Sequence, residues 1–292
     1  MCKIVKRQQY LKKIILYICS QSLQEKLKLN EESNIEVIIW RHMEEAATYL
    51  QERMGDEEGV LLISDDGEVC NQMVERAVPV VALLYEGIER NHFWKIPYAI
   101  ENINVLNIEY LEQIYRRYRS IPWDILETER CILREIKVED VDSIARIYES
   151  PNVRKFMEPL YTPIEKEKEY TREYIKHVYG FYEYGTWVVV EKNLGKIIGR
   201  AGLESYDDNE ADAIELGYLI EDEYQRKGYG YEVCSAVLKY AEEILGIAVI
   251  DTNIENENIA SICLCEKLGF RFISKFHKKG KEYYRYRYQN HI

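Results

Sequence analysis

The stretch YLIEDEYQRKGYGYEVCSAVLKYAEE, from Tyr218 to Glu243, leads from a short apolar run into a helical pattern through a loop with two glycines. After Gly228 and Gly230, apolar residues recur every three to four positions, which predicts an amphipathic helix that ends at Gly246. The first N–H groups of a helix lack intrahelical partners and lie at the positive end of the helix dipole. Because glycines let a ligand approach the backbone closely, the loop predicts an anion-binding site, with a simple tight turn as the alternative.

Two common nucleotide-binding motifs do not fit this loop. A dinucleotide-binding fingerprint needs a third glycine at position 233, where this chain has Val233. A Walker P-loop needs Gly-Lys followed by Ser or Thr, and that sequence does not occur in the chain. Neither motif therefore accounts for the predicted anion site.

The loop resembles a known cofactor motif. Gln225, two residues, Gly228, one residue and Gly230, placed between a strand and a helix, resemble the acetyl-CoA motif of the GNAT superfamily of N-acetyltransferases. The resemblance covers residues 125–290 and includes the stretches ETERCILREIKVEDVDSIARIYESPNVRKFM, GKIIGRAGL, IELGYLI and NENIASICLCEKLGF. These are similar to the branch that contains ribosomal-protein N-terminal acetyltransferases and polyamine acetyltransferases. The resemblance implies a mixed α+β sheet and an N-acetyltransferase that moves an acetyl group from acetyl-CoA to a primary amine by direct attack in a ternary complex.

The resemblance also implies which residues hold acetyl-CoA. The backbone of Leu219 and Ile220 would pair with the pantetheine arm, and the glycine loop would wrap the pyrophosphate. A backbone N–H near Tyr218 would polarise the thioester carbonyl, and Asn258 would contact the arm where two strands diverge. The implied cofactor-binding residues are Tyr218, Leu219, Ile220, Gln225, Arg226, Lys227, Gly228, Tyr229, Gly230, Tyr231 and Asn258.

Glu215 and Ser261 are the implied catalytic residues. Glu215 is the best-placed carboxylate to take a proton from the ammonium acceptor, with Glu204 behind it, and a purely structural strand carboxylate is the alternative. The family often has a tyrosine as general acid where this chain has Cys265. Ser261 is the first candidate to hydrogen-bond the leaving sulfur, because free cysteines are most often packing residues. Whether Ser261, Cys265 or water serves as the acid stays open.

The acceptor pocket is expected along residues 152–184. Glu158, Glu165, Glu183 and the acidic loop 205–210 favour a cationic amine. A peptide N-terminus, a polyamine and an aminoglycoside are the open alternatives for the acceptor. The rival function is a non-catalytic acyl-CoA sensor that reports cofactor level to the first domain.

Composition limits the other functions of this 292-residue chain. Its net charge of −12 and pI of about 5.1 argue against nucleic acid as a partner. The seven cysteines lack C-x-x-C spacing and the five histidines lie far apart, so neither a disulfide framework nor a metal site is predicted. Reduced thiols suit a cytoplasmic protein. No segment approaches the roughly 20 apolar residues of a membrane span, so no membrane partner is expected.

The basic end of the chain is rich in tyrosine and could suggest a nucleic-acid contact. Its side chains alternate as those of a half-buried strand do, which favours a closing hairpin that turns at Lys279 and Gly280.

The sequence predicts two domains. From Lys12 to Tyr118, short apolar runs alternate with helical stretches, which indicates βαβ units and a mainly parallel sheet. The rhythm changes around Pro122, so we expect a Rossmann-like accessory domain over residues 1–123 and the acetyltransferase domain over residues 124–292. The accessory domain is open to roles in regulation, acceptor positioning or dimerisation, the last of which would make the protein a homodimer.

An acidic pair stands out in the first domain. Asp65 and Asp66 follow an apolar strand and faintly resemble the late acidic motif of haloacid-dehalogenase-type phosphatases. The first strand, however, carries no aspartate nucleophile, so activity is not expected in this domain. Capping of the next helix explains the pair equally well.

Overall fold

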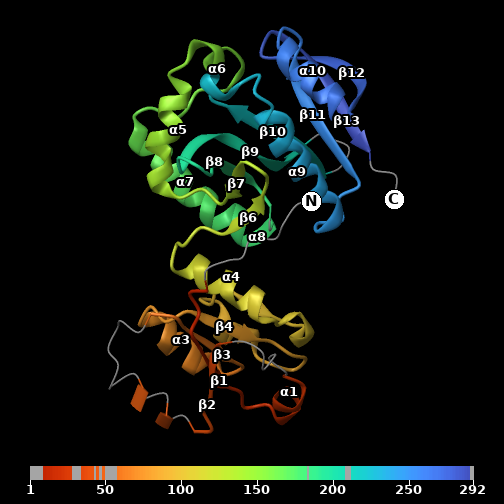
Figure 1. Ribbon diagram of the computed structural model, residues 1–292. Helices are drawn as coiled ribbons and strands as arrows, with labels where there is room; N and C mark the ends of the chain where they lie inside the picture. The colour runs from red at the N-terminus through yellow and green to blue at the C-terminus, as the bar shows by residue number, and fades with distance from the viewer. Residues whose placement is uncertain are drawn as a thin grey trace. The chain divides into compact units, whose positions relative to one another are not determined.

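The computed structural model describes residues 9–27, 34–42, 44–45, 48–49, 58–182, 184–207 and 212–289. The chain forms two compact units, which are divided between Ile121 and Pro122. Each unit has its own β-sheet and its own hydrophobic core (Figure 1). In the part of the chain that the structure describes, no helix has both the length and the apolar character that a membrane crossing requires.

The N-terminal unit is built on a parallel sheet of five strands in the order β2-β1-β3-β4-β5. Its elements are β1 (Lys13–Tyr17), α1 (Gln21–Lys26), β2 (Glu36–Ile39), β3 (Val60–Ser64), α3 (Gly67–Glu75), β4 (Val80–Leu83), η1 (Arg90–Phe93), β5 (Ala99–Ile100), η2 (Ile103–Val105) and α4 (Ile108–Tyr118). Strands β3 and β4 are buried along their whole length, as continuous apolar strands of a doubly covered sheet are. The predicted parallel, Rossmann-like sheet is therefore confirmed.

Helices α3 and α4 cover opposite faces of this sheet. Val69 of α3 packs in one apolar cluster with Ile15, whereas Leu111 of α4 packs in another with Ile14. Because neighbouring residues of a strand point to opposite faces, the two clusters lie on the two sides of the sheet. This arrangement explains why the strands are apolar without alternation.

The C-terminal unit is built on a mixed sheet of eight strands in the order β12-β13-β11-β10-β9-β8-β7-β6. Its strands are β6 (Asp124–Glu127), β7 (Cys131–Arg134), β8 (Thr186–Glu191), β9 (Lys196–Asp207), β10 (Asp212–Ile220), β11 (Val249–Glu255), β12 (Arg271–Lys278) and β13 (Lys281–Gln289). Its helices are η3 (Val138–Asp140), α5 (Val141–Tyr148), α6 (Pro151–Phe156), α7 (Ile164–Tyr174), η4 (Ile175–Tyr179), α8 (Gly180–Tyr182), η5 (Asp222–Tyr224), α9 (Tyr229–Glu243) and α10 (Ile259–Lys267). The predicted mixed α+β sheet is confirmed, as is the closing hairpin that turns at Lys279 and Gly280.

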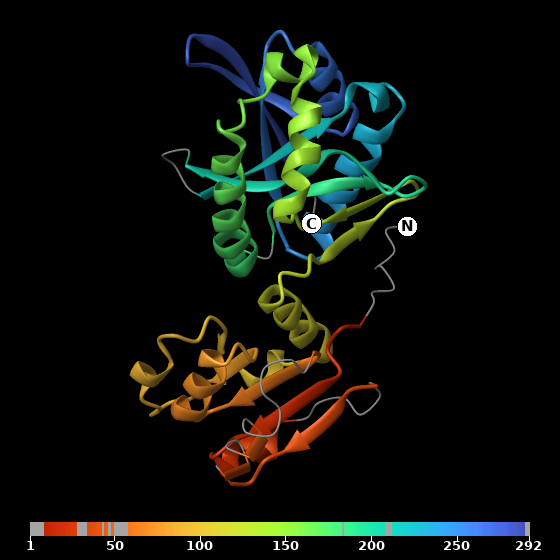
Figure 2. The same ribbon diagram turned by 90° about the vertical axis from the view of Figure 1, so that its left-hand side faces the viewer.

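Among the described residues of this sheet, β10 and β11 are the only parallel neighbours, and they part soon after they pair. β10 pairs with β9 from Asp212 to Ile220, but among the described residues it pairs with β11 only at Glu215, opposite Asp251. The carboxyl-terminal half of β10 therefore has one edge that β11 does not cover. Helix α9 packs on one face of the sheet, and α5 and α7 lie on the other (Figure 2).

Candidate active site

Glu215 lies where β10 and β11 part. Its Oε1 accepts a hydrogen bond of 3.0 Å from the backbone N–H of Asn253 on β11. Glu204 of β9 lies directly opposite Glu215 in the antiparallel pair, so both carboxylates project from the same face of the sheet. Thr186 Oγ1 donates to Glu204 Oε1 over 2.5 Å. The structure thus places the carboxylates of the two predicted acids, Glu215 and Glu204, side by side.

The surroundings of Glu215 change its proton affinity. Burial raises the pKa of Glu215, hydrogen bonds from Asn253 lower it in part, and the charge of Glu204 raises it further. The resulting pKa lies above the ordinary value of 4.5. A carboxylate with a raised pKa accepts a proton more readily, which suits a general base that works near neutral pH.

The loop between β10 and α9 depends on two residues with left-handed backbone. Arg226 has a φ of 55° and Gly228 a φ of 87°, a region that glycine adopts without strain. Gln225 Nε2 donates to the carbonyl of Ile220 over 2.8 Å and so ties the loop to the end of β10. Helix α9 begins at Tyr229, and its N-cap Gly228 offers no side chain to the first N–H groups. Those donors are available to an anion.

The backbone beside this loop leaves room for an extended ligand. Gly217, on the half of β10 that β11 does not cover, is exposed, and a Cβ atom there would meet nothing within 4 Å. A Cβ atom on Gly230 would lie 3.2 Å from Leu264 Cδ2, so this glycine lets α9 begin close to α10. An open strand edge followed by an uncapped helix N-terminus suits a ligand with an extended chain and a phosphate group.

Tyr218, Ser261 and Asn258 form one hydrogen-bonded group at the start of α10. Asn258 caps this helix, because its Oδ1 accepts from the N–H of Ser261 over 3.2 Å. The hydroxyl of Tyr218 donates to Ser261 Oγ over 2.9 Å, which leaves the serine hydrogen for another acceptor. Burial is the main cause that raises the pKa of Tyr218 above its ordinary value, so the phenol keeps its proton at neutral pH. The sequence indicated all three residues, but it did not indicate that the side chain of Tyr218 orients Ser261.

Cys265 lies in the core of the C-terminal unit. Its side chain is buried with those of Phe270 and Tyr286. Burial, followed by the charge of Glu266, raises the pKa of the Cys265 thiol to about 12. Such a thiol is a weak proton donor, and its surroundings are those of a packing residue.

Cations and aromatic rings gather around the glycine loop. Lys227 Nζ lies 5.9 Å from the ring centroid of Tyr224, and Lys267 Nζ lies 4.6 Å from that of Tyr231. Arg226 and Lys227 are both exposed. Positive charge at the start of α9 adds to the helix dipole in attracting phosphate groups.

Two of the residues expected around the acceptor have other surroundings. Glu158 forms an ion pair with Lys279, with 2.7 Å between Oε1 and Nζ, and this partner holds the pKa of Glu158 below its usual value. Glu165, in the first turn of α7, is exposed. Glu183 and residues 208–210 of the acidic loop lie outside the described residues.

A series of tyrosines ends at Tyr174, which is linked to Glu204 through Thr186. Tyr161, Tyr170 and Tyr174 form a series of ring contacts, with centroids 5.3 and 6.2 Å apart. The hydroxyl of Tyr174 accepts from the backbone N–H of Thr186 over 2.7 Å, and Thr186 Oγ1 in turn donates to Glu204. Burial raises the pKa of Tyr174, and the charge of Glu204 raises it further. In the ranges that the structure describes, no group of three or more His, Cys, Asp and Glu side chains is arranged to hold a metal ion.

Comparisons with known proteins agree with this geometry. Residues 130–271 match a family model described as an acetyltransferase (GNAT) domain. The uncharacterised N-acetyltransferase p20 of Bacillus licheniformis is 27% identical over 151 residues, which are 51% of this chain and 83% of that protein. The uncharacterised N-acetyltransferase YoaA of Bacillus subtilis (strain 168) is 29% identical over 152 residues, which are 50% of this chain and 82% of that protein.

Solved structures share the fold. The ribosomal-protein-S5-alanine acetyltransferase of Vibrio fischeri is 19% identical and matches with a TM-score of 0.50 over 58% of this chain and 96% of its own. At this identity the likeness concerns the fold alone. The family model and the named relatives thus show that residues 130–271 of the C-terminal unit match an acetyltransferase (GNAT) domain and that this part of the chain is similar to N-acetyltransferases.

Proposed function

We propose that the C-terminal unit transfers the acetyl group of acetyl-CoA to a primary amine by direct attack in a ternary complex. The observation that carries this proposal is the parting of β10 and β11 at Glu215. It leaves an open strand edge between a carboxylate on one side and the Tyr218–Ser261 pair on the other. The carboxylate would serve the amine, the backbone N–H groups of the open strand edge would serve the thioester carbonyl, and Ser261 would serve the leaving sulfur.

The proposed acetyl-CoA site follows the chain from β10 into α9. The backbone of Tyr218, Leu219 and Ile220 binds the pantetheine arm, and residues 225–231 surround the pyrophosphate. The uncapped start of α9 and the open space beside Gly217 support this assignment. Asn258 contributes indirectly, since its side-chain oxygen is engaged in holding Ser261.

In the proposed chemistry the thioester supplies the activated acetyl group. The residues of this chain accept a proton, stabilise the charge on the carbonyl oxygen and hydrogen-bond the leaving sulfur. Glu215 takes a proton from the ammonium acceptor, directly or through water, so that the amine nitrogen can bond to the carbonyl carbon. A backbone N–H near Leu219 stabilises the charge on the carbonyl oxygen. As the carbon–sulfur bond breaks, the nitrogen releases its second proton to solvent, and the departing sulfur, hydrogen-bonded by Ser261, takes a proton from solvent. The hydroxyl of Tyr218 keeps Ser261 directed toward that sulfur.

Ser261 is preferred over Cys265 because of their surroundings. The Ser261 hydroxyl is partly exposed and oriented by Tyr218, whereas the Cys265 thiol is buried in the core with a raised pKa. The acceptor is proposed to be a cationic amine, since Glu204 and Glu215 present two carboxylates on one face. A peptide N-terminus, a polyamine and an aminoglycoside all meet this description.

A two-step experiment tests the proposal. The full chain is first titrated with acetyl-CoA by calorimetry, and binding is expected between about 1 μM and 1 mM, the usual range of substrate constants. A panel of the three amine classes is then screened for release of the CoA thiol. Turnover with one class supports the proposal and identifies the acceptor. Binding without turnover for any amine would favour an acyl-CoA sensor, and no binding would contradict both.

A further inference from the structure

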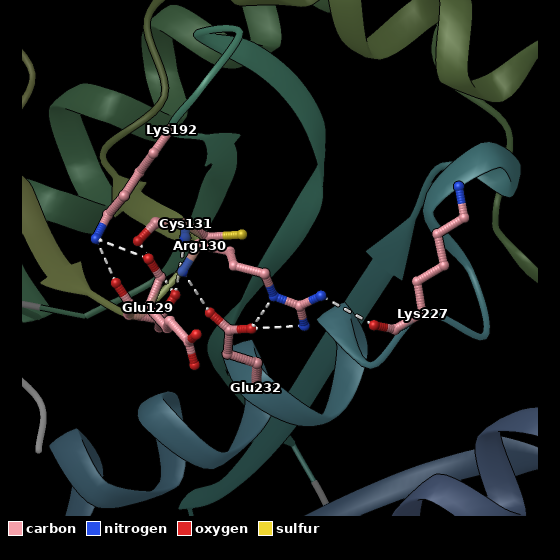
Figure 3. A network of polar contacts seen from close by, with 7 residues as sticks. Glu129, Arg130, Cys131, Lys192, Lys227 and Glu232 are labelled. Atoms are coloured by element: carbon pink, nitrogen blue, oxygen red, sulfur yellow. Dashed lines mark hydrogen bonds and ion pairs between the residues drawn. The ribbon is translucent and has the colours of Figure 1, made fainter.

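We propose that Arg130 is a positioning residue for acetyl-CoA. From the turn between β6 and β7 it fixes the shape of residues 225–231, which bind the pyrophosphate under the proposed function. Arg130 lies about a hundred positions from this loop in the sequence, and its guanidinium contacts both sides of Gly228 (Figure 3). The inference rests on the proposed function, and its test distinguishes a failure of the inference from a failure of the proposed function.

The contacts of Arg130 span the start of α9. Its Nη1 donates to the carbonyl oxygen of Lys227 over 3.0 Å. Its Nε and Nη2 each lie 2.7 Å from Oε2 of Glu232, in the first turn of α9, and its backbone N–H donates to Oε1 of the same carboxylate over 2.8 Å. The guanidinium also lies 3.9 Å from the ring centroid of Tyr229. One side chain therefore holds the loop on both sides of the left-handed Gly228.

The bond to Lys227 sets the direction of a neighbouring donor. In a trans peptide the carbonyl oxygen and the following N–H point in opposite directions. With the carbonyl of Lys227 held toward Arg130, the N–H of Gly228 points away from Arg130. Residues 225–228 are exposed, so an anion can reach this N–H together with the first donors of α9. Arg130 thus orients a phosphate-binding N–H without touching the phosphate itself.

Arg130 also neutralises a charge that would oppose the ligand. Burial raises the pKa of Glu232, but hydrogen bonds from Thr128 and Arg130 outweigh this effect, and the pKa lies below its ordinary value. Glu232 is therefore ionised, in the first turn of the helix at which the pyrophosphate would bind. The contact of Oε2 with both Nε and Nη2 of Arg130 offsets this negative charge.

The turn that presents Arg130 is itself held in place. Lys192 lies beside Glu129 of this turn (Figure 3). Its Nζ contacts the carboxylate of Glu127 over 2.6 Å and also the carbonyls of Thr128 and Glu129. The backbone N–H of Lys192 donates to the carbonyl of Arg130 over 3.0 Å. Because both ends of the turn are anchored, the guanidinium reaches the loop from a fixed base.

The test uses calorimetric titration of the full chain with CoA, which needs no turnover and no known acceptor. The variant Arg130→Met is expected to raise the Kd for CoA about tenfold or more, because a charge-assisted contact is lost and Glu232 is left uncompensated. Arg130→Lys keeps the charge but not the planar guanidinium. Its Kd for CoA is therefore expected to lie between those of Arg130→Met and the wild type. Arg146→Met is the matched control, since Arg146 is exposed on α5 and bonds only within its own helix among the contacts described.

A second ligand distinguishes positioning from general damage. S-acetylpantetheine lacks the pyrophosphate, so its affinity is expected to be the same for Arg130→Met and wild type. If Arg130→Met bound CoA like the wild type, or weakened both ligands equally, the positioning role would be overturned. A wild type that does not bind CoA would instead contradict the proposed function, whatever the variants do.

Discussion

Helices α3 and α9 each follow a strand, but their first backbone N–H groups have different partners. Helix α3 follows β3, and the carboxylate of Asp66 accepts from the N–H groups of Glu68 and Val69 over 2.9 and 3.0 Å. Helix α9 follows β10, and its N-cap Gly228 offers no side chain. Helix α3 thus has a side chain of the chain itself on its first donors, whereas α9 has no side-chain cap and its first donors are proposed to bind a ligand.

The strand ends differ in the same way. In a sheet of the order 2-1-3-4-5, ligands usually bind beyond the carboxyl ends of β1 and β3. Here Asp65 occupies that position, and its carboxylate accepts from the backbone N–H groups of Cys19 and Ser20 over 2.6 and 2.9 Å. In the C-terminal unit β10 and β11 part instead. Binding capacity is therefore better judged from the donors that a fold leaves unsatisfied than from the fold itself.

The contrast between the capped start of α3 and the uncapped start of α9 is tested most directly by placing an aspartate at the N-cap of α9. The variant Gly228→Asp places a carboxylate at the start of α9 and forces a non-glycine residue to a φ of 87°. Backbone strain of about 1–3 kcal/mol and repulsion of the phosphates are expected to raise the Kd for CoA about a hundredfold. Calorimetric titration measures this effect.

Gly87→Asp is the matched control for this variant. Gly87 has a φ of 92°, nothing lies within 4 Å of its would-be Cβ, and it belongs to the N-terminal unit. The strain is similar, but no CoA contact is involved. Equal loss of CoA affinity in both variants would show that Gly228 matters for stability alone.

The next largest effect is expected at the base. Glu215→Gln should lower turnover by tenfold or more, because an amide cannot take the proton of the ammonium acceptor. Since the carboxylate is the active form and burial raises its pKa above 4.5, the activity of the wild type should fall as the pH falls through that raised value. The variant should lose this limb of the pH–rate profile. A variant with wild-type turnover and an unchanged profile would leave Glu215 as a structural carboxylate.

The Tyr218–Ser261 pair should have a smaller effect with a distinct signature. Ser261→Ala is expected to lower turnover about tenfold, and Tyr218→Phe less, since it removes only the group that orients Ser261. If Tyr218 acts through Ser261, the double variant should be no slower than Ser261→Ala. Steady-state rates with acetyl-CoA and the acceptor from the amine screen measure this. Cys265→Ala serves as the control, and a slower rate for it than for Ser261→Ala would reverse the assignment.

Local patterns were enough to predict much of the C-terminal unit. The glycine pair of the loop and the helix after it depend on backbone conformation and on apolar spacing, which are properties of a short stretch. The capping role of Asn258 could also have been predicted, because asparagine is among the preferred N-cap residues. The sequence interpretation did not include this cap, and its prediction that Asn258 contacts the cofactor arm stays a prediction.

The remaining contacts depend on residues that are far apart in the chain. Tyr218 and Ser261 are 43 positions apart, and Arg130 and Glu232 are 102 positions apart. Glu158 forms its ion pair with Lys279, which is 121 positions away. Such pairs follow from how the strands and helices pack, and one sequence without its fold carries no local signal for them.

The smallest expected effect comes from the reverse exchange, in which α3 is given the uncapped start of α9. Asp66→Ala removes the cap, and the loss of its hydrogen bonds to Glu68 and Val69 is expected to lower the free energy of unfolding by about 1 kcal/mol. Denaturant unfolding measures this change, and Glu68→Ala, which keeps the cap, is the control. Affinity for CoA should stay at the wild-type value, because donors freed at α3 face no ligand site in the proposal. If CoA affinity fell with Asp66→Ala, the N-terminal unit would take part in cofactor binding, and the contrast between the two helix starts would no longer separate structure from function.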